Sequence, residues 1–117
     1  MAYRLARSAE AQLDALLLDS ARQHGRHAAE RYALLILTVL SALGEDPSPP
    51  GCRDIPPLPG IRAYPIRLAR QRIAPSQRVG APRHLVVYRV APDGVTEILG
   101  FVHDRMVLSR AAARVAD

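Results

Sequence analysis

HLVVYRVAPDGVTEILGFVH, residues 84–103, contains two runs of residues that favour strands on either side of a short turn sequence. Leu, Val and Tyr dominate the first run, 84–91, and Val, Thr, Ile and Phe dominate the second, 95–103. Such residues are enriched in strands, and the Pro-Asp-Gly sequence at 92–94 is a turn signal. The stretch therefore predicts an antiparallel hairpin, which is the strongest strand signal in the chain.

The N-terminal part of the sequence predicts a short strand followed by a helix. Residues 2–7, AYRLAR, place their large apolar side chains on one face, as a strand does. Ser8 is a favourable helix N-cap, residues 9–24 carry an apolar stripe at helical spacing, and Gly25 is placed to end the helix. The strand has no partner adjacent in sequence, so we expect it to pair with a later strand.

The middle of the chain predicts a second helix, a stiff connection and a further strand. Residues 26–43 are apolar at helical spacing and nearly all round in their second half. This pattern indicates packing on several sides, which we favour, or one face offered to a partner. Residues 44–60 hold six of the ten prolines and predict a non-helical connection that ends the helix. Residues 61–70 predict a strand interrupted by Pro65, at an edge or a bulge, and residues 71–82 predict a polar loop.

The order of these elements decides the expected fold class. One strand, two helices and three strands predict an α+β fold, with an N-terminal strand, a helical hairpin and a three-stranded antiparallel meander in one small sheet. The pattern within 105–116 also allows a short C-terminal helix. The length of 117 residues fits a single domain, 1–117.

Composition limits the chemistry that the chain can perform. The net charge is +5 and all sixteen cationic residues are arginine, which favours acidic partners, either nucleic acid or a protein surface. A single cysteine excludes an internal disulfide, and four scattered histidines do not make a metal site, so we expect no metal and no cofactor. Because there is no signal peptide and no apolar run of membrane-spanning length, we expect a cytoplasmic protein with no membrane partner.

Charge is unevenly distributed along the chain. From Ile55 to Pro92 there are seven arginines and no acidic residue. One interpretation is a solvated sheet face; the other, which we favour, is a surface that binds an anion, either RNA or an acidic protein segment. The arginines of this predicted surface are Arg62, Arg67, Arg70, Arg72, Arg83 and Arg89, with Arg78 in the loop between the strands.

Two histidines could take part in acid–base chemistry. RNA cleavage needs one group to accept the 2′-hydroxyl proton and another to protonate the leaving oxygen. His84 and His103 are the candidates, with Arg105 as a phosphate clamp beside Asp104. The alternative gives His103 a hydrogen-bonding role at the end of a strand, and the sequence favours this alternative slightly.

Several segments together resemble a known family. YRLARSAEAQLDAL, AAERYALLILTVLSAL and especially HLVVYRVAPDGVTEILGFVHDRMVLSR resemble toxins of the RelE/ParE superfamily, and IRAYPIRLARQR followed by PRHLVVYR is similar to its ParE-like subgroup. The resemblance covers almost the whole chain, and the hairpin with the VHDRM stretch is its most specific part. It implies a helical hairpin packed on a small antiparallel sheet.

The resemblance also implies a biological setting. Such toxins belong to type II toxin–antitoxin pairs, in which a cognate antitoxin wraps the toxin with its C-terminal segment. The complex, rather than the toxin alone, binds operator DNA. ParE-type members poison DNA gyrase without nuclease chemistry, whereas RelE-type members cut messenger RNA on the ribosome with basic sheet residues and a C-terminal tyrosine.

The chain departs from the RelE-type pattern and is closer to the ParE type. It has no lysine on the sheet and no tyrosine after Tyr88, so we expect a gyrase inhibitor rather than an enzyme. A ribosome-dependent endoribonuclease that uses His84, His103 and Arg105, and a degenerate non-toxic relative, are the alternatives. The residues expected to bind the target are His103, Arg105, Met106 and Arg110.

Overall fold

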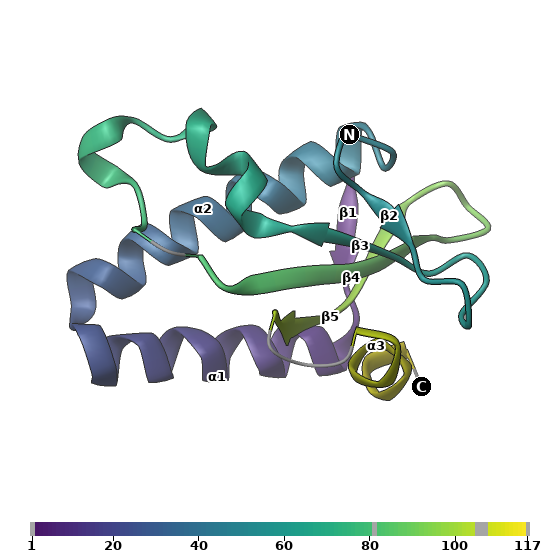
Figure 1. Cartoon of the computed structure of the whole chain (residues 1–117), viewed down its shortest axis with the longest axis horizontal. Coiled ribbons are helices and arrows are strands. Elements are labelled where there is room, and N and C mark those ends of the chain that lie inside the picture. Colours follow the sequence, from purple (N-terminus) through teal and green to yellow (C-terminus); the bar gives the residue numbers. More distant parts are fainter. Residues whose placement is uncertain (1, 81, 105–107, 117) are drawn as a thin grey trace.

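The computed structural model describes residues 2–80, 82–104 and 108–116, and their arrangement is shown in Figure 1. Helices and strands follow the predicted order, which confirms the α+β fold class. In chain order the elements are β1 (Tyr3–Leu5), α1 (Arg7–His24), α2 (Arg26–Glu45), β2 (Arg53–Asp54), β3 (Arg62–Pro65), the 3₁₀ segments η1 (Ile66–Arg72) and η2 (Pro75–Gln77), β4 (His84–Val90), β5 (Thr96–His103) and α3 (Leu108–Ala116).

The sheet contains the predicted meander and two further strands. Strands β3, β4 and β5 pair in antiparallel fashion, as predicted, within a five-stranded sheet of order β1-β5-β4-β3-β2. The N-terminal strand β1 pairs with the later strand β5, which confirms that expectation, but the pairing is parallel. The predicted meander is therefore confirmed, and β1 and the short strand β2 at its two edges make the whole sheet mixed and five-stranded.

Helices α1 and α2 cover one face of the sheet. The apolar side of α2 places Leu35, Ile36 and Leu40 in one buried cluster with Val86 of β4 and Ile98 of β5. Successive residues of a strand point to opposite faces, so these strand residues mark the helix-covered face. Gly25 ends α1 in a backbone conformation with φ of 92°, as predicted, and lets α2 fold back against α1.

The short helix α3 packs on the opposite face. Its buried residues Ala111, Ala112 and Val115 form a second cluster with Leu85 and Val87, which alternate with the residues facing α2. In Figure 1, α3 lies beside β5, away from α2. The allowed C-terminal helix is thus present over Leu108–Ala116, while the start of the predicted range, 105–107, lies outside the described residues.

The prediction that Ser8 caps the first helix is wrong. The backbone N–H of Ala6 donates to the carbonyl of Ile98 over 2.9 Å, so the strand ladder continues to Ala6. The carbonyl of Ala6 then accepts from the N–H of Glu10 over 3.0 Å and closes the first helical turn. The helix therefore begins at Arg7, and Ser8 lies inside it.

The first two turns of α1 complete the hydrogen bonding of β5. A register shift after Val87 leaves Leu99 as an extra residue in β5, a β-bulge that locally disrupts the ladder. Ser8 Oγ donates to the carbonyl of Leu99 over 3.3 Å, and the N–H of Phe101 donates to Gln12 Oε1 over 2.9 Å. Side chains of α1 thus take the place of a neighbouring strand beyond the end of β1.

The predicted strand over 61–70 is wrong beyond Pro65. The chain turns there into η1, which buries Ile66 and Ala69 in the cluster beneath α2, an arrangement that an extended strand would not give. The predicted loop 71–82 includes the short helical turn η2.

The proline-rich segment also differs from expectation at both of its ends. Helix α2 continues through Gly44, because the N–H of Asp46 donates to the carbonyl of Ala42 over 2.9 Å and closes one more turn. Further on, Arg53–Asp54 form the edge strand β2. Across the described residues, no helix has both the length and the apolar character that crossing a membrane requires.

Candidate functional site

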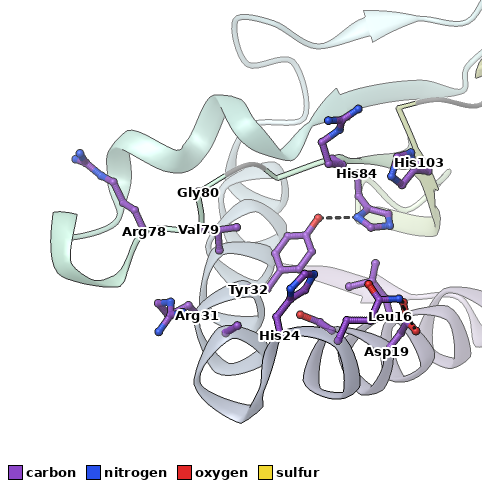
Figure 2. Close-up of a pocket in the computed structure, with 14 residues that line it drawn as sticks. Leu16, Asp19, His24, Arg31, Tyr32, Arg78, Val79, Gly80, His84 and His103 are labelled. Atoms are coloured by element: carbon purple, nitrogen blue, oxygen red, sulfur yellow. Dashed lines mark hydrogen bonds between the residues drawn. The ribbon is translucent and has the colours of Figure 1, made fainter.

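A pocket of about 590 Å³ lies at the tip of the helical hairpin, where α1 ends and α2 begins. The far wall is formed by Val79, Gly80 and His84 with Arg78 and Arg83, and His103 at the end of β5 closes one side. The helical hairpin, the residues around β4's start and the end of β5 therefore meet here (Figure 2). The pocket has a volume typical of sites that bind small molecules.

Tyr32 and His84 form the inner wall of the pocket. Tyr32 projects from the apolar stripe of α2, and its hydroxyl lies 2.7 Å from Nδ1 of His84 on β4 (Figure 2). Burial raises the pKa of Tyr32 to about 12, so the phenol keeps its proton near neutral pH. Burial, helped by the nearby His103, lowers the pKa of His84 to about 4. Both rings are therefore neutral near neutral pH.

His103 extends the pocket wall from β5 and meets a carboxylate. His84 and His103 face each other across β4 and β5, with ring centroids 5.2 Å apart in an edge-on arrangement. Nδ1 of His103 lies 3.2 Å from Oδ1 of Asp104. The same carboxylate accepts from Nε of Arg83 at 3.0 and 3.2 Å. Asp104 thus links His103 to Arg83, and all three residues lie where β4 begins and β5 ends.

The low pKa of His84 predicts that the protein loses stability in mild acid. Between its ordinary value of 6.5 and about 4, the unfolded chain binds a proton at this position that the folded chain does not. The free energy of unfolding must therefore fall as the pH falls through this window, and the contribution is complete above 6.5. Allowing for partial solvent screening, we expect a loss of about 2 kcal/mol between pH 7 and pH 4.

Urea denaturation across this pH range measures the loss, and His84→Asn is the control. The amide oxygen of asparagine can accept from the Tyr32 hydroxyl but cannot titrate, so the variant should show a shallower fall in stability with pH. An identical pH dependence in the variant and the wild type would assign the loss to other groups.

The predicted arginine surface has carboxylates close to part of it. Arg89 pairs with Glu97 at 2.7 Å, Arg83 with Asp104 at 3.0 Å, and Arg62 lies 3.7 Å from Asp54. These acidic residues lie outside the acid-free stretch of sequence, but the sheet brings them beside it. Arg62 also donates to the carbonyl of Pro47 and to Ser48, which ties the proline-rich segment to the sheet.

Three further predicted arginines, Arg67, Arg70 and Arg72, lie on η1, apart from the pocket, whereas Arg78 lines it. Arg70 donates from Nε to the carbonyl of Val79 over 2.6 Å and holds the segment after η2 in place. Arg67 and Arg72 are exposed and make no ion pair or hydrogen bond with the described residues. The structure thus brings Arg83 and Arg78 together with His84 and His103 and leaves the other predicted arginines elsewhere.

Two of the residues expected to contact a target, Arg105 and Met106, lie outside the described residues. Arg110 is exposed in the first turn of α3. Tyr32 is one site residue that the sequence missed, because its helical spacing is that of a core residue. The hydroxyl of a buried tyrosine needs a hydrogen-bond partner. This requirement could have predicted that a polar group faces Tyr32.

Comparison with protein families gives one finding for this chain. A family model described as the ParE toxin of the type II toxin–antitoxin system parDE matches residues 3–108, which include both long helices and the whole sheet. A search of curated proteins gives no match. The match extends over most of the chain and agrees with the resemblance carried by the hairpin. The chain therefore belongs to the ParE toxin family of type II toxin–antitoxin systems.

Proposed function

We propose that this type II toxin inhibits DNA gyrase and that its cognate antitoxin neutralises it. The family match over residues 3–108 is the observation that carries the proposal, since ParE-type toxins are the gyrase-directed branch of the superfamily. The absence of lysine and of any tyrosine after Tyr88 supports it further, because the RelE-type nuclease residues are missing. On this proposal the protein acts by binding in the cytoplasm and is not an enzyme.

The electrostatics of the pocket also favour binding over nuclease chemistry. A general acid must carry a proton near the working pH, and His84, with a pKa of about 4, does not. Its Nδ1 is occupied by the Tyr32 hydroxyl, and Arg83 is engaged by Asp104. A phosphodiester entering the pocket would therefore meet side chains that are already hydrogen-bonded to other residues.

Net charge supports the antitoxin part of the proposal. The toxin carries +5, so an acidic antitoxin segment would be attracted to it and held by complementary charges. The exposed arginines Arg67 and Arg72 are available for such contacts on η1. We propose that operator DNA is bound only by the complex, through the antitoxin.

Induction of the toxin in cells that carry a reporter plasmid tests the proposal as a whole. We expect growth to stop, the plasmid to become relaxed and messenger RNA to stay intact, with all three restored to normal by co-expression of the antitoxin. Arg110→Ala should weaken the growth inhibition, because Arg110 is exposed in the segment expected to contact gyrase. Unchanged growth at high expression would instead indicate a non-toxic relative.

One observation favours a second candidate, a ribosome-dependent endoribonuclease. His84, His103 and Arg83 line one pocket, as an acid–base site for RNA would require. This candidate predicts that the double variant His103→Ala, Arg105→Ala loses cleavage of ribosome-bound messenger RNA while its circular dichroism spectrum stays unchanged. Normal cleavage by that variant would remove the assignment.

A further inference from the structure

We propose that the pocket at the tip of the helical hairpin binds a nucleotide, with the base against Tyr32 and His84 and the phosphate at a rim formed by Arg31 and Arg78. The proposal concerns a small-molecule site and is separate from gyrase binding. It rests on the shape of the cavity, the charge of its rim and the chemistry of its inner wall.

Cations dominate the rim. Arg31 from α2 and Arg78 from the segment after η2 lie on the same side of the pocket, and both guanidinium groups point outward from it in Figure 2. Asp19 is the carboxylate among the described lining residues, and Arg83 already has Asp104 as its partner. A group that binds at this mouth therefore meets net positive charge, which favours an anion.

The two rim arginines differ from the paired arginines elsewhere in the molecule. Arg78 donates from Nε to the carbonyl of Ile73 over 2.9 Å, so its guanidinium is positioned without losing its charge. Arg31 is half-buried and makes no hydrogen bond or ion pair with any described residue. Arginine binds phosphate through short charge-assisted hydrogen bonds, and a positioned guanidinium loses little entropy on binding.

The inner wall is neutral, aromatic and partly apolar, with the rings of Tyr32 and His84 tilted 47° to each other. The hydrogen bond between Tyr32 and His84 satisfies one polar group of each ring, and Leu16 and Val79 complete the surface around them. Nucleobases stack on tyrosine and histidine rings in many nucleic-acid-binding proteins, because every base has a π face. A wall of this kind suits a heteroaromatic ring better than it suits a charged group.

Size and layout together favour a nucleotide over other anions. A volume of about 590 Å³ falls in the range of small-molecule sites. Inorganic phosphate would use the arginines but leave the aromatic wall without a contact. An extended acidic peptide would likewise contact the rim and leave the recess between Tyr32 and His103 unfilled. A phosphate joined to a planar ring uses both parts of the pocket.

Titration of the full chain with adenosine monophosphate, followed by backbone amide NMR, tests the proposal. We expect saturable shifts at Val79, His84 and His103, which line the pocket. Adenosine and inorganic phosphate should each bind at least about tenfold more weakly, because each lacks one half of the contact. Arg31→Gln should weaken nucleotide binding by about tenfold, as expected for loss of one arginine–phosphate contact.

The matched control is Arg26→Gln, which removes the same charge from the same helix. Arg26 is exposed and lies 3.4 Å from Glu30, outside the residues that line the pocket, so nucleotide binding should be unchanged. Thermal melts of both variants verify that they are folded. If both variants weaken nucleotide binding equally, the effect comes from the net charge of the protein alone, and the proposal is overturned.

Two further results would also overturn it. If inorganic phosphate binds as tightly as the nucleotide, the pocket is a simple anion site. If no nucleotide binds at millimolar concentration while a glutamate-rich peptide does, the pocket receives an acidic protein segment instead. Each readout uses the isolated chain, so the result does not depend on whether the toxin inhibits gyrase.

Discussion

Leu40→Ala is expected to destabilise the protein by about 3 kcal/mol, because it leaves a cavity at the centre of the cluster beneath the sheet. Leu40 is 0% exposed and packs on the face of α2 that meets the sheet. A loss of this size in a chain of this length lowers the melting temperature by about 10 °C or more. Differential scanning calorimetry and urea denaturation measure the two quantities.

Leu37→Ala is the matched control for this prediction. Leu37 is 49% exposed on the same helix, one turn earlier, so the two substitutions change helix propensity equally and differ in burial. We expect the control to change stability by less than about 0.5 kcal/mol. Equal losses for the two variants would contradict the assignment of these helix faces.

Gly100→Val is expected to destabilise the protein by about 2 kcal/mol through overpacking between α1 and α3. A Cβ atom at Gly100 would lie 2.5 Å from Gln12 Oε1 and 2.7 Å from the Cβ of Val115. Gln12 is held there by its hydrogen bond from the N–H of Phe101, so either that bond or the packing of α3 must give way. The melting temperature and the amide exchange of α3 report the two outcomes.

Gly80→Val provides the comparison, since a Cβ atom at Gly80 would have no atom within 4 Å. Its backbone does not adopt a positive φ, so valine introduces no conformational strain there. We expect Gly80→Val to leave the melting temperature nearly unchanged. A Gly100→Val variant that is as stable as the Gly80→Val variant would show that α3 does not pack tightly on the bulge.

Local patterns in the sequence predicted the elements that are stabilised by local interactions. The hairpin of β4 and β5 follows from strand-favouring residues around Pro92-Asp93-Gly94, and the break between the helices follows from Gly25. The prediction of an N-cap at Ser8 was wrong because a long-range contact sets where the helix begins. The hydrogen-bond ladder to β5 continues to Ala6, and the helix starts directly after it. Propensity is a weak guide where tertiary contacts compete with it.

The strand predicted over 61–70 failed for a related reason. Its alternation of apolar residues fits either an extended strand or a tight helical turn, and burial of Ile66 and Ala69 beneath α2 selects the turn. The short strand β2 was missed because only two residues, Arg53 and Asp54, pair with β3. Periodicity gives no signal over so short a segment.

The candidate site was predicted in part. The sequence identified His84, His103 and Arg83, and the structure places them together. It did not identify Tyr32, whose spacing is that of a core residue, or Arg31, whose importance depends on the cavity beside it. Likewise, the acid-free stretch of sequence did not reveal that Glu97 and Asp104 would pair with its arginines across the sheet.

The proposed function is tested most directly by a supercoiling assay with purified gyrase, using the toxin alone and the toxin with its antitoxin. We predict that the toxin blocks supercoiling or traps cleaved DNA, and that the antitoxin relieves the effect. We also predict that His84→Asn remains inhibitory, because His84 is neutral near pH 7 and is hydrogen-bonded to Tyr32. Full gyrase activity in the presence of excess toxin would contradict the proposal. Attention would then turn to the ribosome, with His103 and Arg105 as the first residues to substitute.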